Sequence, residues 1–220
     1  MVNNPFFSVT PLKKDMIVGR KEFLKNINKE VMSSLIDNKI IIIKGDSGMG
    51  KSFFVRSAVD ELKTKKSIKL FNYDFSLDLI NKLRKLPDES KIKKQIVVVI
   101  DRFELMLMLS EQLQTKIFEL MTELCKTGIT FLITSSDDLI EKTRILNLEL
   151  KKYFKTFNVP GLTYEEAEDL VINRLNMERK KDLKSIEPFT VKELKEVYKN
   201  SKGNPRIILM LCGVLFDNKF

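Results

Sequence analysis

The longest apolar runs of the chain are short and rich in β-branched residues. Residues 40–43 and 96–100 show no polar alternation, which is typical of strands buried on both faces of a parallel sheet. Three further segments, at residues 68–75, 130–135 and 154–159, also have strand-like composition. All of these runs are far shorter than the ~20 apolar residues of a membrane helix, so we expect no membrane segment.

Helical periodicity separates the predicted strands. Apolar positions recur three to four residues apart over residues 23–31 and 52–62, and a short helix is expected before Pro87. A long helix is predicted over residues 104–126, with Thr127-Gly128 as its C-cap, and another over residues 137–152. This alternation predicts an α/β fold in which helices sandwich a five-stranded parallel sheet.

The pattern becomes purely helical after Pro160-Gly161. Capping boxes at residues 163–166 and 190–193, and Asn204-Pro205, predict three helix starts. We therefore expect residues 1–160 to form the core with an N-terminal segment, and residues 161–220 to form a small all-helical lid.

A phosphate-binding pattern, G-x-x-x-x-G-K-[ST], follows the first predicted strand and opens a predicted helix. In this context the glycines let successive backbone N–H groups point at a phosphate, and the helix dipole adds to the anion site. Lys51 is expected to bridge β- and γ-phosphate oxygens, and the Ser52 hydroxyl to bind Mg²⁺. A glycine turn with an incidental lysine is the less favoured alternative. The predicted cofactors are ATP and Mg²⁺, held by Gly45, Asp46, Ser47, Gly48, Met49, Gly50, Lys51 and Ser52.

A carboxylate ends the strand predicted at residues 95–101. Asp101 occupies the position from which P-loop enzymes hold the metal ion, although a helix cap is an alternative role for it. The predicted metal ligands are therefore Ser52 and Asp101.

The amino-acid composition excludes some kinds of catalytic and metal-binding site. The chain has no His, which excludes histidine bases and histidine-bound zinc. Its net charge of +9 comes from residues 1–100, which hold 20 Lys/Arg against 11 Asp/Glu. A basic half is typical of a nucleic-acid surface, but compositional drift of the genome explains it equally well. Cys125 and Cys212 lack metal-type spacing and are interpreted as buried thiols of an intracellular, cytoplasmic protein.

Taken in order, these motifs resemble the additional-strand ATPases, specifically the AAA+ and related signal-transduction ATPases, with archaeal ATPases and origin-recognition proteins nearest. The resemblance implies that Val18 and Gly19 lie against the adenine, where an ordinary turn is the alternative. It implies that a hydroxyl of residues 134–136, preferably Ser135, orients the attacking water as sensor 1, unless it only caps a helix. Arg206 resembles sensor 2, which approaches the γ-phosphate, with a surface arginine as the alternative. The matching residues are 4–6, 18–22, 45–52, 96–101, 134–136, 161–167 and 203–206.

One departure from the family affects the catalytic base. The family usually places a glutamate directly after the metal aspartate, where this chain has Arg102. Glu104 is the nearest carboxylate, and it shares a face with Asp101 if Arg102 and Phe103 are already helical. Otherwise Glu104 is a solvated residue at a helix start, and slow hydrolysis or a binding switch is expected.

The resemblance favours an ATP-binding and ATP-hydrolysing switch or motor that acts in a DNA transaction, such as replication initiation or mobile-element maintenance. An assembly of several subunits would need an arginine acting in trans; Arg144 is the candidate, with a solvated face as the favoured alternative. Because no winged-helix domain follows before Phe220, we expect DNA binding to be weak, built by oligomerisation, or carried by a segment outside the chain. The expected DNA contacts are Lys82, Arg84, Lys85, Lys91, Lys93 and Lys94.

Two other functions remain open. The first is a signalling or scaffold ATPase that controls protein partners without nucleic acid. The second is a small-molecule kinase, against which the Asn204-Pro205-Arg206 motif of the lid argues.

Overall fold

A computed structural model describes residues 4–6, 19–37, 39–64, 67–86, 95–136, 152–179 and 183–219. The chain divides into two compact units. The first, called here the core unit, is Glu22–Val159, and the second, the lid unit, is Met1–Lys21 with Pro160–Phe220. The N-terminal segment thus groups with the C-terminal helices, whereas the sequence analysis assigned it to the core.

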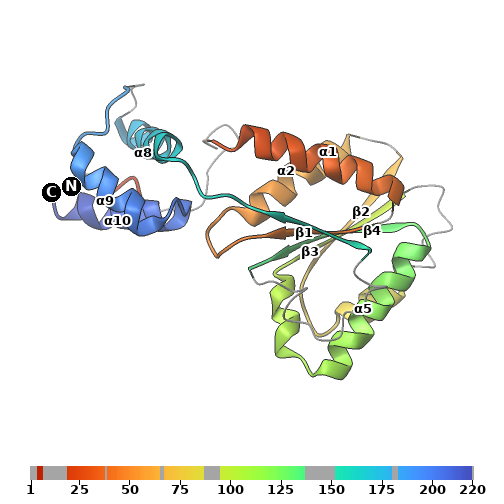
Figure 1. The fold of residues 1–220 in the computed structure, drawn as a ribbon. Coiled ribbons are helices and arrows are strands. Elements are labelled where there is room, and N and C mark those ends of the chain that lie inside the picture. The colour runs from red at the N-terminus through yellow and green to blue at the C-terminus, as the bar shows by residue number, and fades with distance from the viewer. Residues whose placement is uncertain are drawn as a thin grey trace. The chain divides into compact units, whose positions relative to one another are not determined.

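A parallel sheet forms the middle of the core unit (Figure 1). Its five strands run in the order β2-β3-β4-β1-β5, and all of them pair in parallel. The sheet predicted from the sequence is confirmed, with each strand end within about one residue of the expected position. The strands are β1 (Ile40–Lys44), β2 (Ile68–Asp74), β3 (Gln95–Asp101), β4 (Ile129–Ser135) and β5 (Phe154–Asn158).

Both faces of this sheet are buried. Ile40, Ile42 and Val98 belong to the cluster packed against α3 (Leu79–Arg84) and α5 (Glu111–Lys126). The residues between them, such as Ile41 and Val97, pack with α1 (Lys21–Asp37) and α2 (Lys51–Lys63) on the other face. Because successive side chains of a strand point to opposite faces, both sets must be apolar, which accounts for the lack of alternation in β1 and β3.

The prediction of one long helix over residues 104–126 is wrong. A 3₁₀ helix, η2 (Phe103–Met108), comes first, and α5 begins only at Glu111. Phe103 and Met106 are both fully buried, and their three-residue spacing matches the 3₁₀ repeat. Gln114 of α5 donates a side-chain hydrogen bond of 2.8 Å to the carbonyl of Leu109, which stabilises the break between the helices. The helix predicted over residues 137–152 lies outside the described residues apart from its last position.

Three helices make up the main part of the lid unit, α8 (Tyr164–Arg179), α9 (Val191–Ser201) and α10 (Pro205–Asp217). The capping box at Thr190 is formed in both directions with Glu193. Asn204 caps α10 by accepting hydrogen bonds from the backbone N–H groups of its second and third residues. All three predicted helix starts are therefore present.

Two N-terminal residues are anchored on the lid unit. The Asn4 side chain donates hydrogen bonds to the Gly213 carbonyl (2.9 Å) and to the Asp217 carboxylate (2.7 Å), both at the end of α10. Phe6 is 3% exposed, and its ring contacts the rings of Phe189 and Phe216. These contacts explain why the N-terminal segment belongs to the lid unit and not to the core.

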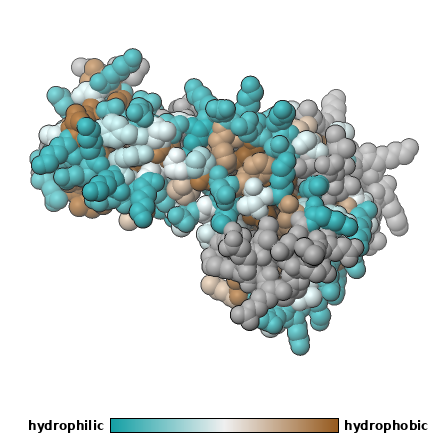
Figure 2. Space-filling view, in the orientation of Figure 1, coloured by the Kyte–Doolittle hydropathy of each residue, from teal (hydrophilic) through white to brown (hydrophobic). Residues whose placement is uncertain are grey.

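The viewed surface is mostly hydrophilic, and its apolar areas are interrupted by polar side chains (Figure 2). Among the described residues, no helix has the length and apolarity needed to cross a membrane.

Candidate nucleotide-binding site

The loop between β1 and α2 has the backbone that a phosphate-binding loop requires. Gly48 and Gly50 have φ angles of 88° and 91°, in the left-handed region that favours glycine. A hydrogen bond of 3.1 Å from the Met49 N–H to the Asp46 carbonyl closes the turn formed by residues 46–49. Helix α2 begins directly after Gly50, so the loop presents a helix N-terminus.

The Lys51 ammonium lies over this loop. Its Nζ donates hydrogen bonds to the carbonyls of Gly45 (2.6 Å) and Asp46 (3.1 Å). The side chain is therefore folded back along the turn that its own motif forms, and it brings a positive charge to the loop.

The two predicted metal ligands meet. The Ser52 hydroxyl lies 3.1 Å and 3.0 Å from the two carboxylate oxygens of Asp101, although 49 residues separate them in sequence. Hydroxyl and carboxylate oxygens are suitable ligands for Mg²⁺, which usually takes one or two protein ligands and fills its other positions with water and substrate phosphates. The described part of the chain has no cluster of three or more His, Cys, Asp or Glu that could hold a metal by itself. The donor set thus fits a metal shared with a phosphate.

Thr134 brings its hydroxyl to Asp101. Thr134 donates a hydrogen bond to one Asp101 oxygen and accepts one of 2.9 Å from the Arg102 N–H. Ser135 is fully buried, and its backbone carbonyl accepts a hydrogen bond of 3.1 Å from the Gly45 N–H. The sequence analysis preferred Ser135 as the sensor 1 hydroxyl that orients the attacking water, and that role stays a prediction; the contact with Asp101 makes Thr134 a second candidate. A polar residue near the end of a buried strand was the available signal, but it did not distinguish the two neighbours.

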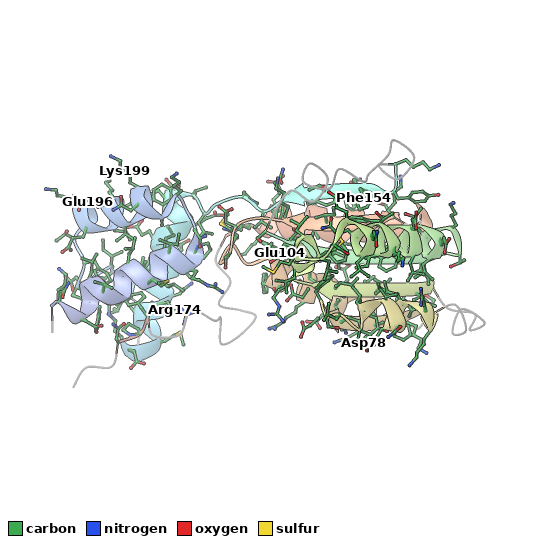
Figure 3. All side chains as sticks on the ribbon, turned by 90° about the horizontal axis from the view of Figure 1, so that it is seen from below. Asp78, Glu104, Phe154, Arg174, Glu196 and Lys199 are labelled. Atoms are coloured by element: carbon green, nitrogen blue, oxygen red, sulfur yellow. The ribbon has the colours of Figure 1, made fainter. Side chains whose placement is uncertain are left out.

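A tight turn connects Asp101 with Glu104. Arg102 has φ 56° and ψ 42°, so it is left-handed, and the 3₁₀ helix begins at Phe103. The condition that Arg102 already be helical in the usual right-handed sense is therefore not met. The Glu104 side chain is half-buried, and its Oε2 is buried without a hydrogen-bond partner among the described residues. Figure 3 labels Glu104 within the core unit.

An aromatic cluster surrounds Phe103, the residue that follows Arg102 in this turn. The Phe103 ring packs edge-on against Phe75, with 5.6 Å between ring centroids, and against Phe118, with 6.1 Å. Phe103 itself is fully buried. The sequence analysis did not identify this cluster, although an aromatic residue between Arg102 and Glu104 was a visible signal.

The other family positions belong to the lid unit. Gly19 has φ 73°, and the Arg20 N–H that follows it donates a 2.7 Å hydrogen bond to Glu166. Arg206 is the second residue of α10 and is exposed. Val18 lies outside the described residues, as does Arg144.

Half of the predicted DNA-contact residues can be located. Lys82 and Arg84 belong to α3, and Lys85 caps its end. Lys82 lies 3.8 Å from Asp78, which Figure 3 labels, and its ammonium sits over the Tyr73 ring. Arg84 and Lys85 are exposed. Lys91, Lys93 and Lys94 lie outside the described residues.

Residues 25–180 match the sequence pattern of a family described as "Novel STAND NTPase 3". The matched range includes the whole P-loop, Asp101, Thr134 and the first lid helix. The chain belongs to this NTPase family.

Solved structures show the same fold. The Walker-type ATPase PABY2304 of Pyrococcus abyssi superposes with a TM-score of 0.66 at 14% identity, covering 98% of this chain and 72% of that one. PCH-2 of C. elegans gives 0.65 at 13% identity, covering 96% and 65%. The Aeropyrum pernix ORC1 protein, solved in complex with DNA, gives 0.60 at 13% identity, covering 98% and 64%.

These likenesses show that the novel STAND NTPase 3 chain shares the fold of these proteins. The chain spans about two thirds of the length of the PCH-2 and ORC1 chains. No curated protein sequence matches it.

Proposed function

We propose that this NTPase binds ATP with Mg²⁺ and hydrolyses it, so that the nucleotide state acts as a molecular switch. The observation that carries the proposal is the meeting of Ser52 and Asp101, 3.0 Å to 3.1 Å apart, beside a glycine loop with the Lys51 ammonium over it. These are the donors that a metal-bound nucleoside triphosphate needs.

The phosphates are held by residues 45–52, where backbone N–H groups and the N-terminus of α2 supply positive potential. A phosphate oxygen would replace the Gly45 and Asp46 carbonyls as the partner of Lys51. Ser52 and Asp101 would hold Mg²⁺, which neutralises charge on the phosphates when bound.

Glu104 is proposed as the group that takes the proton from the attacking water. A buried carboxylate oxygen with no hydrogen-bond partner in the described part of the chain is costly to maintain, unless a ligand or water uses it. Thr134 joins Ser135 as a candidate for the sensor 1 residue, because its hydroxyl contacts Asp101.

Further roles are proposed for three residues outside the core unit. Arg206 is proposed as the sensor 2 cation, and its place at the exposed start of α10 supports that role. Val18 and Gly19 are proposed to receive the adenine.

A DNA transaction in the cytoplasm is the proposed context. The ORC1 structure in complex with DNA supports it, as do exposed Arg84 and Lys85. Control of protein partners without nucleic acid is the second candidate, supported by membership in a STAND family. Assembly into homo-oligomers, or with other proteins, fits either context.

ATP turnover with and without DNA, on wild type and Lys51→Ala, tests the proposal. Lys51→Ala should abolish tight ATP binding in calorimetry, because it removes the cation of the loop. Lys63→Ala, at the exposed end of the same helix, is the matched control and should bind ATP like wild type. Unchanged ATP affinity in Lys51→Ala would contradict the assignment of the nucleotide site. If DNA leaves the rate of ATP turnover unchanged at every salt concentration, the signalling alternative is favoured.

A further inference from the structure

Strand β2 forms one edge of the sheet and carries a row of three side chains on one face. Lys69, Phe71 and Tyr73 alternate along the strand, so their side chains point to the same face, and each residue is half-exposed. Their partners on β3, at positions 96, 98 and 100, are at most 3% exposed. The row therefore marks the place where the apolar face of the sheet ends and solvent begins.

The two aromatic rings of this row lie side by side and nearly parallel. The ring centroids of Phe71 and Tyr73 are 6.4 Å apart, and the ring planes differ by 28°. A cation lies over each ring, since the Lys69 Nζ is 5.0 Å from the centroid of Phe71 and the Lys82 Nζ is 5.8 Å from that of Tyr73. The Lys82 side chain is 40% exposed. Because an ammonium group stays in contact with water, the ring faces that the lysines cover are the faces turned to solvent.

Positive charge continues from this row along α3, and all of these residues belong to the core unit. Arg84 and Lys85 follow Lys82 and are exposed. Asp78, labelled in Figure 3, lies 3.8 Å from Lys82 and opposes part of this charge. The other acidic residue of the segment, Asp74, alternates with Tyr73 and points to the other face of the strand. The face that carries the rings is thus positive on balance.

We propose that Lys69, Phe71, Tyr73 and Lys82, called here the β2 edge surface, bind single-stranded DNA. Aromatic rings in a positively charged setting are what the bases of a single strand stack on, whatever their sequence. The bases of a duplex are stacked on one another, about 3.4 Å apart along each strand, and leave no face for a protein ring. Adjacent bases of the single strand stack on the two rings, and the lysines move from the rings to the phosphates.

The inference rests on the DNA context proposed above and adds the form of the DNA and the residues on which its bases stack. Fluorescence anisotropy tests it without ATP. The probes are a labelled oligothymidylate of about twenty nucleotides, longer than the roughly 4–16 that one small binding domain covers, and a duplex of the same length. Wild type should bind the single strand more tightly than the duplex.

Two substitutions remove the rings and keep an apolar side chain over the edge of the core. Phe71→Leu and Tyr73→Leu should each weaken binding of the oligothymidylate by about tenfold, the effect of one lost stacking contact. Tyr73→Phe keeps the ring and should bind like wild type. Thermal denaturation of each variant shows that it is folded, so that a loss of affinity is not a loss of structure.

A third substitution tests the charge without changing an apolar side chain. Lys69→Gln should weaken binding of the oligothymidylate and reduce the slope of its logarithmic salt dependence by about 0.7, the effect of one phosphate contact on a single strand. Lys192→Gln is the matched control, because it removes the same charge from an exposed position on α9. It should leave both the affinity and the slope unchanged.

The outcomes separate this inference from the DNA context on which it rests. If Phe71→Leu, Tyr73→Leu and Lys69→Gln all bind the single strand like wild type, the rings only cover the edge of the core and the inference is overturned. If binding is instead lost when Arg84→Gln and Lys85→Gln are combined, the DNA context stands without it. A wild type that prefers the duplex would also overturn the inference. If wild type binds neither probe, the DNA context itself is wrong.

Discussion

The Ser52 hydroxyl lies 3.1 Å and 3.0 Å from the two carboxylate oxygens of Asp101. The order of the strands produces this contact. Strands β1 and β3 both pair with β4, so the loop after β1 and the end of β3 lie at the same edge of the sheet, where parallel strands present their carboxyl ends. The metal ligands of the proposed site are thus brought together by the sheet and not by local sequence.

Asp101→Asn should weaken Mg²⁺-dependent ATP binding and stop turnover, because an amide keeps the shape of the carboxylate but loses its charge. Phosphate release and ATP affinity across a magnesium titration measure the two effects. Asp78→Asn, at the exposed start of α3, is the control and should behave as wild type. Equal turnover of Asp101→Asn and wild type at all magnesium concentrations would show that Asp101 has only a structural role.

Thr134→Val should lower turnover by about tenfold or more, because it removes the hydroxyl that bonds both the Asp101 carboxylate and the Arg102 N–H. Thr134→Ser keeps the hydroxyl and should retain most activity. Steady-state phosphate release on the two variants, with Ser135→Ala beside them, decides the assignment. If Ser135→Ala loses turnover while Thr134→Val does not, the sensor 1 role belongs to Ser135.

Glu104→Gln should retain ATP and Mg²⁺ affinity but lose on the order of a hundredfold in turnover, the usual contribution of a positioned acid or base. Separate measurements of binding by calorimetry and of single-turnover hydrolysis distinguish the two effects. Glu111→Gln, an exposed glutamate in the first turn of α5, is the control. If Glu104→Gln hydrolyses ATP at the wild-type rate, either another group activates the attacking water or the protein acts mainly by binding nucleotide.

The sheet and the phosphate loop could be predicted from the sequence because each has a local physical signature. Residues 40–43 must be apolar throughout when both faces are covered, and Gly48 and Gly50 are needed where φ is near 90°. The predicted length of the helix after Asp101 was wrong for a different reason. The buried pair Phe103 and Met106 is compatible with a 3.6-residue repeat as well as with a 3₁₀ turn, and only tertiary packing selects between them.

Choices that depend on strand facing or on distant contacts could not be predicted. Thr134 and Ser135 are adjacent hydroxyls that must point to opposite faces of β4, and sequence alone does not say which face meets Asp101. The grouping of the N-terminal segment with the lid depends on the Asn4 contact with Gly213, across 209 residues. In the sequence, the Asn4 side-chain amide gives no indication that its hydrogen-bond partner is the carbonyl of Gly213.

The capping box of α9 should make the stability of the lid unit depend on pH. Hydrogen bonds from the Thr190 backbone, and then from Lys219 and the Thr190 hydroxyl, lower the pKa of Glu193 to about 2, from its ordinary value of 4.5. A carboxyl group whose pKa is lower in the folded state stabilises that state when ionised, so its contribution is complete above about pH 4.5. The contribution is lost as the pH falls from there towards about 2, where the folded protein takes up the proton.

Thermal denaturation of wild type and Glu193→Gln at pH values from 7 to 2 measures this dependence. Wild type should melt at the higher temperature at neutral pH, and the difference should shrink between about pH 4.5 and pH 2 as Glu193 becomes protonated and resembles the amide. Thr190→Ala in the same scan is a second check, because it removes the hydroxyl and should reduce, without abolishing, the pH dependence that the backbone N–H still provides. A melting-temperature difference that stays constant from pH 7 to pH 2 would mean that the Glu193 carboxylate contributes nothing to the stability of the folded lid.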